Sequence, residues 1–252
     1  MHKSYKDIFN QRANLYHTAM GLAPLARSLE FELAVKYLAL SGREKLLDMP
    51  AGGGYLKNYL GSAVSSVVFM ETSTAFAEYC PKKEESCVIG DFAVLPLATA
   101  SMDRILSLAA LHHVNEREHF FRESLRVLSP NGRLVIADVE EGSDTANFLN
   151  VFVDQYNSMG HEGLFLTSQD EQVLEREGFN IINSVPEEFH WHFESKQQML
   201  DFSRGLFGLD LADDDTLYSG INQYLAPTFG EDGGSCRWQL RYIVAEPAKS
   251  ER

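Results

Sequence analysis

The stretch 45–56, which reads KLLDMPAGGGYL, constrains the fold of this chain more than any other segment. A short apolar run ends on Asp48, and three consecutive glycines, Gly52, Gly53 and Gly54, follow shortly after it. Glycine adopts positive φ values without strain and lets a ligand approach the bare backbone. This order predicts a buried strand, a tight loop and a helix. Loops of this kind lie at the ligand-binding edge of open α/β sheets.

Two common nucleotide-binding loops do not match this stretch. The dinucleotide fingerprint G-x-G-x-x-G needs a third glycine, and Lys57 occupies that position after Gly52 and Gly54. A phosphate-binding P-loop ends in Gly-Lys-Ser or Gly-Lys-Thr, and Tyr55 and Leu56 stand there instead. A dehydrogenase is therefore kept only as a competing interpretation.

Strand-like and helix-like segments alternate along the chain. We expect strands at 45–49, 64–70, 87–90, 104–108, 133–138, 179–184 (extended or resumed through 190–193) and 237–245. We expect helices at 1–43 in two pieces, 55–61, 72–80, 116–128, 145–159, 168–178 and 195–229. Residues 129–132, which read SPNG, should end the helix at 116–128 in a turn. Ser168 with Glu171 forms a capping-box pattern for the helix at 168–178. Such alternation predicts an α/β fold with a doubly wound, mostly parallel sheet.

Composition narrows the classes of partner and compartment. Lys and Arg total 22 against 36 Asp and Glu, so the formal net charge of −14 disfavours nucleic acid as a partner. No apolar run approaches the roughly 20 residues that span a bilayer, so we expect no membrane partner. The amino terminus lacks the apolar core of a signal peptide. The three cysteines are odd in number and show no metal-ligand spacing, and together these features favour a reducing, cytoplasmic compartment.

Several motifs in order resemble those of the class I S-adenosylmethionine (SAM) dependent methyltransferases. Asp48, Gly52 and Gly54 fit the first motif D-x-G-x-G-x-G, while Pro50 stands where its first glycine is expected. The segment GDFAVLPLATASMDRILSL resembles the family's GDA-x-x-LPF-x-x-x-SFD-x-V, and the next residues resemble its segment ending in Leu-His-His-Val. The resemblance extends from Asp48 to Asp138.

This resemblance implies a seven-stranded sheet with an antiparallel last strand, SAM as cofactor and S-adenosylhomocysteine as product. Glu71 is then the acid that accepts hydrogen bonds from the ribose hydroxyls, which suits a carboxylate because it accepts two donors at once. Asp91 is implied to reach the adenine amino group, Phe92 to face the ring, and the backbone near Leu108 to face the methionine part. In the alternative interpretation, Asp91 only caps a helix or turn. The implied cofactor-binding residues are Asp48, Pro50, Ala51, Gly52, Gly54, Glu71, Thr72, Asp91, Phe92 and Leu108.

His112 and His113 are the candidate catalytic residues. Imidazole takes up a proton near neutral pH, so either histidine could act as a general base for an acceptor. Adjacent residues do not both point into one pocket from regular structure. In the alternative interpretation, one histidine packs under the loop and the other caps the following helix. We expect no metal site.

The acceptor site is expected in the parts added to the core, a helical cap at 1–43 and a helical insertion at 195–229 within a domain covering 44–252. The candidate acceptor-binding residues are Tyr5, Tyr16, His161 and Phe207. The alternative is that the added helices only pack onto the sheet. The expected function is in-line methyl transfer from SAM to a small molecule. A SAM-binding enzyme of the same fold that transfers no methyl group and a non-catalytic SAM-binding protein are its competitors. The acceptor and the oligomeric state are left open.

Overall fold

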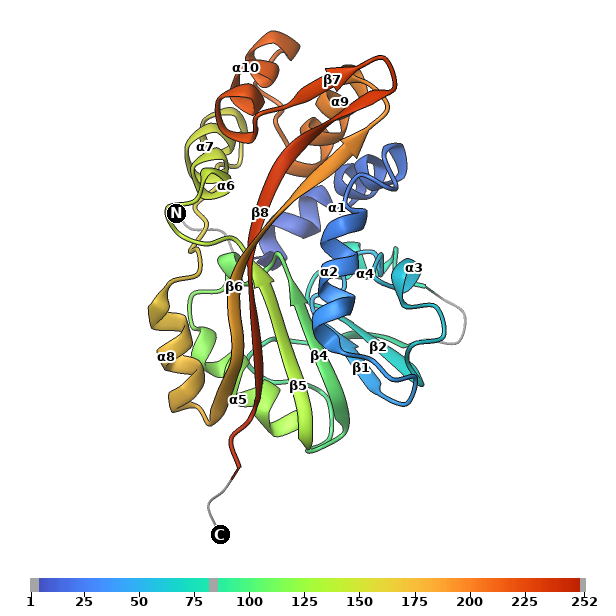
Figure 1. The fold of residues 1–252 in the computed structure, drawn as a ribbon, viewed down its shortest axis with the longest axis vertical. Coiled ribbons are helices and arrows are strands. Elements are labelled where there is room, and N and C mark those ends of the chain that lie inside the picture. The colour runs from blue at the N-terminus through green and yellow to red at the C-terminus, as the bar shows by residue number, and fades with distance from the viewer. Residues whose placement is uncertain (1–4, 82–85, 250–252) are drawn as a thin grey trace.

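The alternating segments assemble into one sheet with helices on both faces (Figure 1). The computed structural model describes residues 5–81 and 86–249. The strands are β1 (Lys45–Asp48), β2 (Ser66–Glu71), β3 (Ser86–Ile89), β4 (Met102–Leu108), β5 (Leu128–Asp138), β6 (Phe179–Phe193), β7 (Thr228–Gly230) and β8 (Gly233–Pro247). The helices are α1 (Tyr5–Leu22), α2 (Ser28–Leu38), α3 (Lys57–Leu60), α4 (Thr74–Ala77), α5 (Arg117–Val127), α6 (Asp144–Asn147), α7 (Asp154–Tyr156), α8 (Ser168–Arg176), α9 (Lys196–Phe207) and α10 (Asp214–Leu225), with the 3₁₀ turn η1 (Leu111–His113) and the π-helical turn η2 (Phe148–Val153).

The strand order is β3-β2-β1-β4-β5-β8-β6, and β7 pairs with β8 outside this path. Strands β1 to β5 pair in parallel, whereas β8 runs antiparallel to both β5 and β6. The predicted doubly wound sheet with an antiparallel last strand is therefore confirmed, and the short β7 is added to the seven strands expected. In Figure 1, β6 and β8 continue beyond the ends of the other strands and carry β7, α9 and α10 at their far end. The division of the chain at residues 43 and 44 stays a prediction.

Both faces of the sheet are buried. The neighbouring residues Leu46 and Leu47 are both fully buried, yet they belong to different hydrophobic clusters because successive side chains of a strand point to opposite faces. The first cluster includes Phe31 of α2, and the second includes Phe120 of α5. Helices on the two faces therefore make β1 a continuous apolar strand, as parallel sheets require.

Three local expectations need correction. The turn predicted at 129–132 lies within β5, because a register shift lets Met102 pair with Leu128 while Arg104 pairs with Arg133. The helix predicted at 145–159 is continuous over residues 144–156, but its middle turn is π-helical. The capping box of α8 is one residue earlier than expected, since its N-cap is Thr167.

The cysteines also depart from expectation. Cys80 and Cys87 are joined by a disulfide, and Cys236 is free and buried. The argument for a reducing compartment from cysteine usage therefore loses its support, because a disulfide of two residues leaves one cysteine over and accounts for the odd number. In the described ranges, no helix is both long enough and apolar enough to cross a bilayer.

Candidate active site

The carboxyl ends of four parallel strands meet at one edge of the sheet. Asp48 ends β1, Glu71 ends β2, Leu108 ends β4 and Asp138 ends β5. The register brings these ends together, since Asp48 pairs with Phe69 on one side and with Leu106 on the other. Ligands of open α/β sheets bind at this edge.

The glycine-rich loop after β1 binds its neighbours through the backbone. The N–H of Gly52, which has a φ of 56°, donates a hydrogen bond of 2.8 Å to the Glu71 carboxylate. Gly54 has a φ of 72°, and a Cβ added there would lie 2.5 Å from Cδ of Pro81. Glycine is therefore required at residue 54 both by backbone conformation and by packing.

Glu71 is fully buried and accepts hydrogen bonds from several donors. Besides Gly52, the N–H groups of Thr72 and Ser73 donate at 2.8 and 3.0 Å, and the hydroxyl of Tyr5 donates at 3.2 Å. Burial raises the pKa of Glu71 to about 7, although the backbone donors act in the opposite direction. Burial therefore opposes ionisation of this carboxyl group, and the hydrogen-bond donors favour it.

Asp48 is buried beside Glu71 and lines a cavity of about 60 Å³. Burial, together with the nearby Glu71 charge, raises the pKa of Asp48 well above its usual value, and no hydrogen bond from the described residues offsets this. A buried carboxylate without such compensation is unfavourable unless a cation approaches it. This cavity therefore suits a positively charged ligand group.

Asp91 and Phe92 follow β3 and line a second, larger cavity of about 610 Å³. The Asp91 carboxylate accepts a hydrogen bond of 2.8 Å from the N–H of Ala93, so one oxygen caps its own turn, as the alternative interpretation has it. Phe92 is buried, and its ring meets Tyr5 edge-on with the centroids 6.0 Å apart. Tyr5 also lines the Asp48 cavity, so the first turn of α1 lies between the two cavities.

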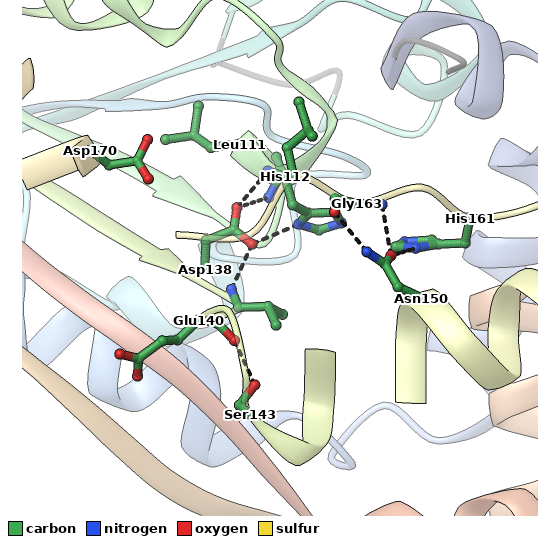
Figure 2. Close-up of polar contacts among 12 residues, drawn as sticks. Leu111, His112, Asp138, Glu140, Ser143, Asn150, His161, Gly163 and Asp170 are labelled. Atoms are coloured by element: carbon green, nitrogen blue, oxygen red, sulfur yellow. Dashed lines mark hydrogen bonds and ion pairs between the residues drawn. The ribbon is translucent and has the colours of Figure 1, made fainter. Parts of the chain in front are cut away.

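His112 is held by Asp138 (Figure 2). Its Nδ1 lies 2.6 Å from Oδ1 of Asp138, while Oδ2 accepts hydrogen bonds from the N–H groups of Ala110 and His112. Burial raises the pKa of Asp138, but the interactions with His112 outweigh it and hold the pKa below its usual value. Asp138 is therefore an ionised acceptor that orients the imidazole.

His113 and His161 complete a cluster of three imidazoles. The His113 ring lies 4.1 Å from the His112 ring, and the His161 ring lies 5.6 and 5.4 Å from these two. One nitrogen from each of the three side chains lies within 4.8 Å of the others. The expectation that only one of the adjacent histidines could face a pocket is wrong here, because both lie in the 3₁₀ turn η1 and line the same cavity.

This third cavity has a volume of about 80 Å³ and aromatic walls. Trp191 of β6 and Trp238 of β8 stack with their centroids 4.2 Å apart, and Phe207 of α9 stacks on Trp238 at 5.5 Å. The walls also include Tyr16 and the three histidines. The long ends of β6 and β8 therefore contribute an aromatic wall to the cavity that the three histidines also line.

Comparison with known proteins assigns the family. Residues 47–136 match a family model described as a methyltransferase domain. An uncharacterized methyltransferase of Oceanobacillus iheyensis is 30% identical over 212 residues, which cover 80% of this chain and 95% of that protein. The chain belongs to the class I SAM-dependent methyltransferases.

Two solved structures share the fold of this methyltransferase at low identity. Geranyl diphosphate C-methyltransferase from Streptomyces coelicolor A3(2), in complex with Mg²⁺, geranyl diphosphate and S-adenosyl-L-homocysteine, has a TM-score of 0.59 at 14% identity, covering 88% of this chain and 79% of that one. The [4+2]-cyclase SpnF has a TM-score of 0.65 at 16% identity, covering 98% and 97% of the two chains. At these identities the likeness concerns the fold alone.

The methyltransferase brings most of its predicted site residues to one edge of the sheet. Asp48, Pro50, Ala51, Gly52 and Leu108 line the small cavity after β1, and Thr72, Asp91 and Phe92 line the larger one. Among the candidates for the acceptor, Tyr16, His161 and Phe207 line the aromatic cavity. Tyr5 lies instead against Glu71, on the side expected for the cofactor.

Sequence reasoning missed other residues of this edge. Trp191 and Trp238 were read only as parts of strands, and Arg12 and Asn150 carried no motif. The alternation of Trp191 with the exposed His190 and His192 is the one signal that could have indicated a buried aromatic face there. The contact of Asn150 with His161 depends on a loop whose path has no sequence signature.

Proposed function

We propose that this methyltransferase moves a methyl group from SAM to a small-molecule acceptor held in the aromatic cavity beside His112, by in-line displacement. The observation that carries the proposal is the shared wall between two cavities. Phe9, Tyr16 and Ala109 line both the Asp48 cavity and the aromatic cavity. A ligand beside Asp48 therefore lies next to a ligand beside the histidines.

The residues at the strand ends fit the cofactor. Glu71 would accept the ribose hydroxyls, and Asp48 would balance the ammonium group of the methionine part. Phe92 and Asp91 would hold the adenine in the larger cavity. Bound SAM supplies a methyl group already activated on a sulfonium. The task of the chain is then to position the acceptor atom and exclude water, which can lower the barrier by roughly 7–11 kcal/mol.

The first turns of α1 would have to move for SAM to enter. The Asp48 cavity holds about 60 Å³, whereas ligand sites span roughly 300–1,000 Å³. The tilted rings of Tyr5 and Phe9 lie 4.4 Å apart, and Phe9 stacks on Phe76 of α4 at 5.0 Å. We propose that this aromatic turn is a lid over the cofactor. Lids of this kind exclude water once the ligand is bound.

The acceptor is proposed to be small and to have a planar or apolar part. The cavity of about 80 Å³ is lined by Trp191, Phe207 and Trp238 and by residues of α1. Flat aromatic walls favour stacking of a ligand ring, and a cavity this small favours a small molecule over a polymer.

His112 is the proposed catalytic residue, and Asp138 is its positioning residue. Asp138 accepts a hydrogen bond from Nδ1, so the Nε2 atom of His112 keeps its lone pair. As a general base, Nε2 can take up the proton that a hydroxyl, thiol or amine acceptor releases. His113, which lines the same cavity, is the second candidate for this role.

Label transfer is the test of the proposed function. The protein is incubated with methyl-labelled SAM and panels of small aromatic and aliphatic alcohols, thiols and amines. Label in an acceptor, with S-adenosylhomocysteine formed in equal amount, is the expected result. The fold similarity to a [4+2]-cyclase makes an enzyme without methyl transfer the second candidate. Tight SAM binding with no label leaving the cofactor for any acceptor would favour that candidate or a non-catalytic binding protein.

A further inference from the structure

We propose that His112, His113 and His161 together bind one divalent transition-metal ion at the acceptor end of the cavity. This inference deepens the proposed function, since the ion would act on the acceptor, but the binding itself can be measured without any acceptor. The ligand atoms come from two segments, the turn η1 and the loop after α7. No sequence motif joins them, which is why the sequence alone indicated no metal site.

The tautomer of His112 is determined by its partner. Both oxygens of Asp138 already accept hydrogen bonds from the backbone N–H groups of Ala110, His112 and Val139, so the Nδ1 atom of His112 carries the hydrogen of their 2.6 Å bond. Its Nε2 atom therefore presents a lone pair. A carboxylate bonded to the far nitrogen is the usual support of a metal-binding histidine, because it orients the ring and raises its basicity.

The tautomer of His161 is determined by Asn150. The Asn150 Oδ1 atom accepts a hydrogen bond of 2.7 Å from the N–H of Gly163, and its Nδ2 donates to the Gly163 carbonyl at 2.8 Å. This pair of bonds settles which end of the amide is oxygen. The Nδ1 atom of His161, 3.0 Å from Oδ1, must then be the donor, and Nε2 again keeps a lone pair (Figure 2).

The three rings meet at one end of the aromatic cavity. His112 and His113 are buried, and one nitrogen from each of the three rings lies within 4.8 Å of the others. Imidazole nitrogens gathered in this way are common ligands of a transition-metal ion.

The donor set indicates the class of ion. Imidazole suits Zn²⁺, Cu²⁺, Ni²⁺ and Fe²⁺, whereas Mg²⁺ and Ca²⁺ prefer oxygen. Zinc–nitrogen bonds are about 2.0–2.1 Å, so two ligands of one ion lie at most about 4.2 Å apart. The three nitrogens lie within 4.8 Å of one another, so the cluster is close to the required size. Three histidines leave the fourth position of a tetrahedral ion open.

An acceptor heteroatom in that open position would lose its proton more readily, as water does on zinc. The proton passes to solvent, the acceptor atom forms a bond with the methyl carbon, and the sulfonium–methyl bond breaks to release S-adenosylhomocysteine. In this case the Nε2 atom of His112 binds the metal ion, and it does not itself take up the proton of the acceptor.

Metal titration of the tag-free, chelator-treated protein tests this inference. Co²⁺ is added while the visible absorption spectrum is recorded, and the metal content of the dialysed protein is measured. We expect one Co²⁺ per chain with the intense bands of a tetrahedral site, and displacement by Zn²⁺. His161→Asn should weaken binding by about 100-fold or more, and Asp138→Asn by roughly 10–100-fold.

The matched control is the double variant His190→Asn and His192→Asn. These exposed rings lie 6.5 Å apart on β6 and form the other pair of neighbouring histidines that could take up metal at the surface. The control should bind Co²⁺ unchanged. Unchanged binding in a folded His161→Asn variant, binding lost only in the control, or no stoichiometric binding would each overturn the inference. Because SAM affinity and label transfer are measured separately, a failure of the metal site leaves the proposed function standing.

Discussion

The hydroxyl of Tyr5 donates a hydrogen bond of 3.2 Å to Oε2 of Glu71, although 66 residues separate them. The same oxygen accepts from the N–H of Gly52 in the glycine-rich loop. The first turn of α1 therefore covers the carboxylate that is proposed to bind the ribose. In the proposed function, the cofactor can therefore enter only when this turn moves.

Tyr5→Phe should strengthen binding of S-adenosylhomocysteine. The substitution removes a hydroxyl that competes with the ribose for Glu71, and a hydrogen bond of this kind contributes about 0.5–1.5 kcal/mol. Calorimetry should therefore show a dissociation constant lower by about 2- to 10-fold. Tyr79→Phe is the control, because its hydroxyl bonds to the exposed Asn14 side chain. Weaker binding in Tyr5→Phe would instead assign Tyr5 a contact with the bound cofactor.

The affinity for S-adenosylhomocysteine should fall as the pH decreases through about 7. Burial raises the pKa of Glu71 to about 7, and the ionised form is the one that accepts both ribose hydroxyls. Dissociation constants measured by calorimetry between pH 6 and pH 8 test this. Glu71→Ala should weaken binding by about 1.5–3 kcal/mol and remove the pH dependence, whereas the exposed Glu78→Ala should do neither.

The free energy of unfolding should also depend on the ionisation of Glu71, and this contribution should fall as the pH rises. The pKa of Glu71 is higher in the folded than in the unfolded protein, so the folded state binds more protons between the two values. Its contribution is fully present below the ordinary pKa of about 4.5 and is lost as the pH rises through about 7. Urea unfolding of the wild type and of Glu71→Gln at several pH values should show this loss in the wild type only. A parallel pH dependence in both proteins would contradict it.

Asp138→Asn should slow methyl transfer while leaving the affinity for S-adenosylhomocysteine unchanged. An amide no longer requires the hydrogen of His112 to be on Nδ1, so the lone pair of Nε2 is lost in part of the molecules. We expect kcat to fall by about 100-fold or more. Single-turnover rates together with calorimetry separate this effect from a binding defect. A fall in cofactor affinity of the same size would point to collapse of the strand edge.

Gly54→Ala should destabilise the fold more than Gly142→Ala. Both glycines have positive φ values, 72° and 80°, so each substitution carries backbone strain of about 1–3 kcal/mol. A Cβ at residue 54 would also lie 2.5 Å from Pro81, whereas residue 142 has no atom within 4 Å. Urea unfolding of both variants measures the difference. Equal losses would show that Pro81 moves aside without resistance.

Much of the fold follows from local patterns in the sequence. The apolar run before Asp48, the glycines after it and the alternation of strands with helices each predict structure through backbone preferences that operate over a few residues. The same holds for Glu71 and Asp138, because a strand that ends on an acid places that acid at the ligand-binding edge of a parallel sheet. The strand-end residues that are proposed to bind the cofactor could therefore be predicted from the sequence alone.

The arrangement of the proposed acceptor site could be seen only in the tertiary structure. The bond from Tyr5 to Glu71, the meeting of His161 with His112 and the stack of Trp191 on Trp238 all join segments distant in sequence. Their distances depend on how far β6 and β8 extend and on the path of irregular loops. Sequence periodicity reports which face of an element is buried, but not which distant element covers it, because that choice is made by packing among whole elements.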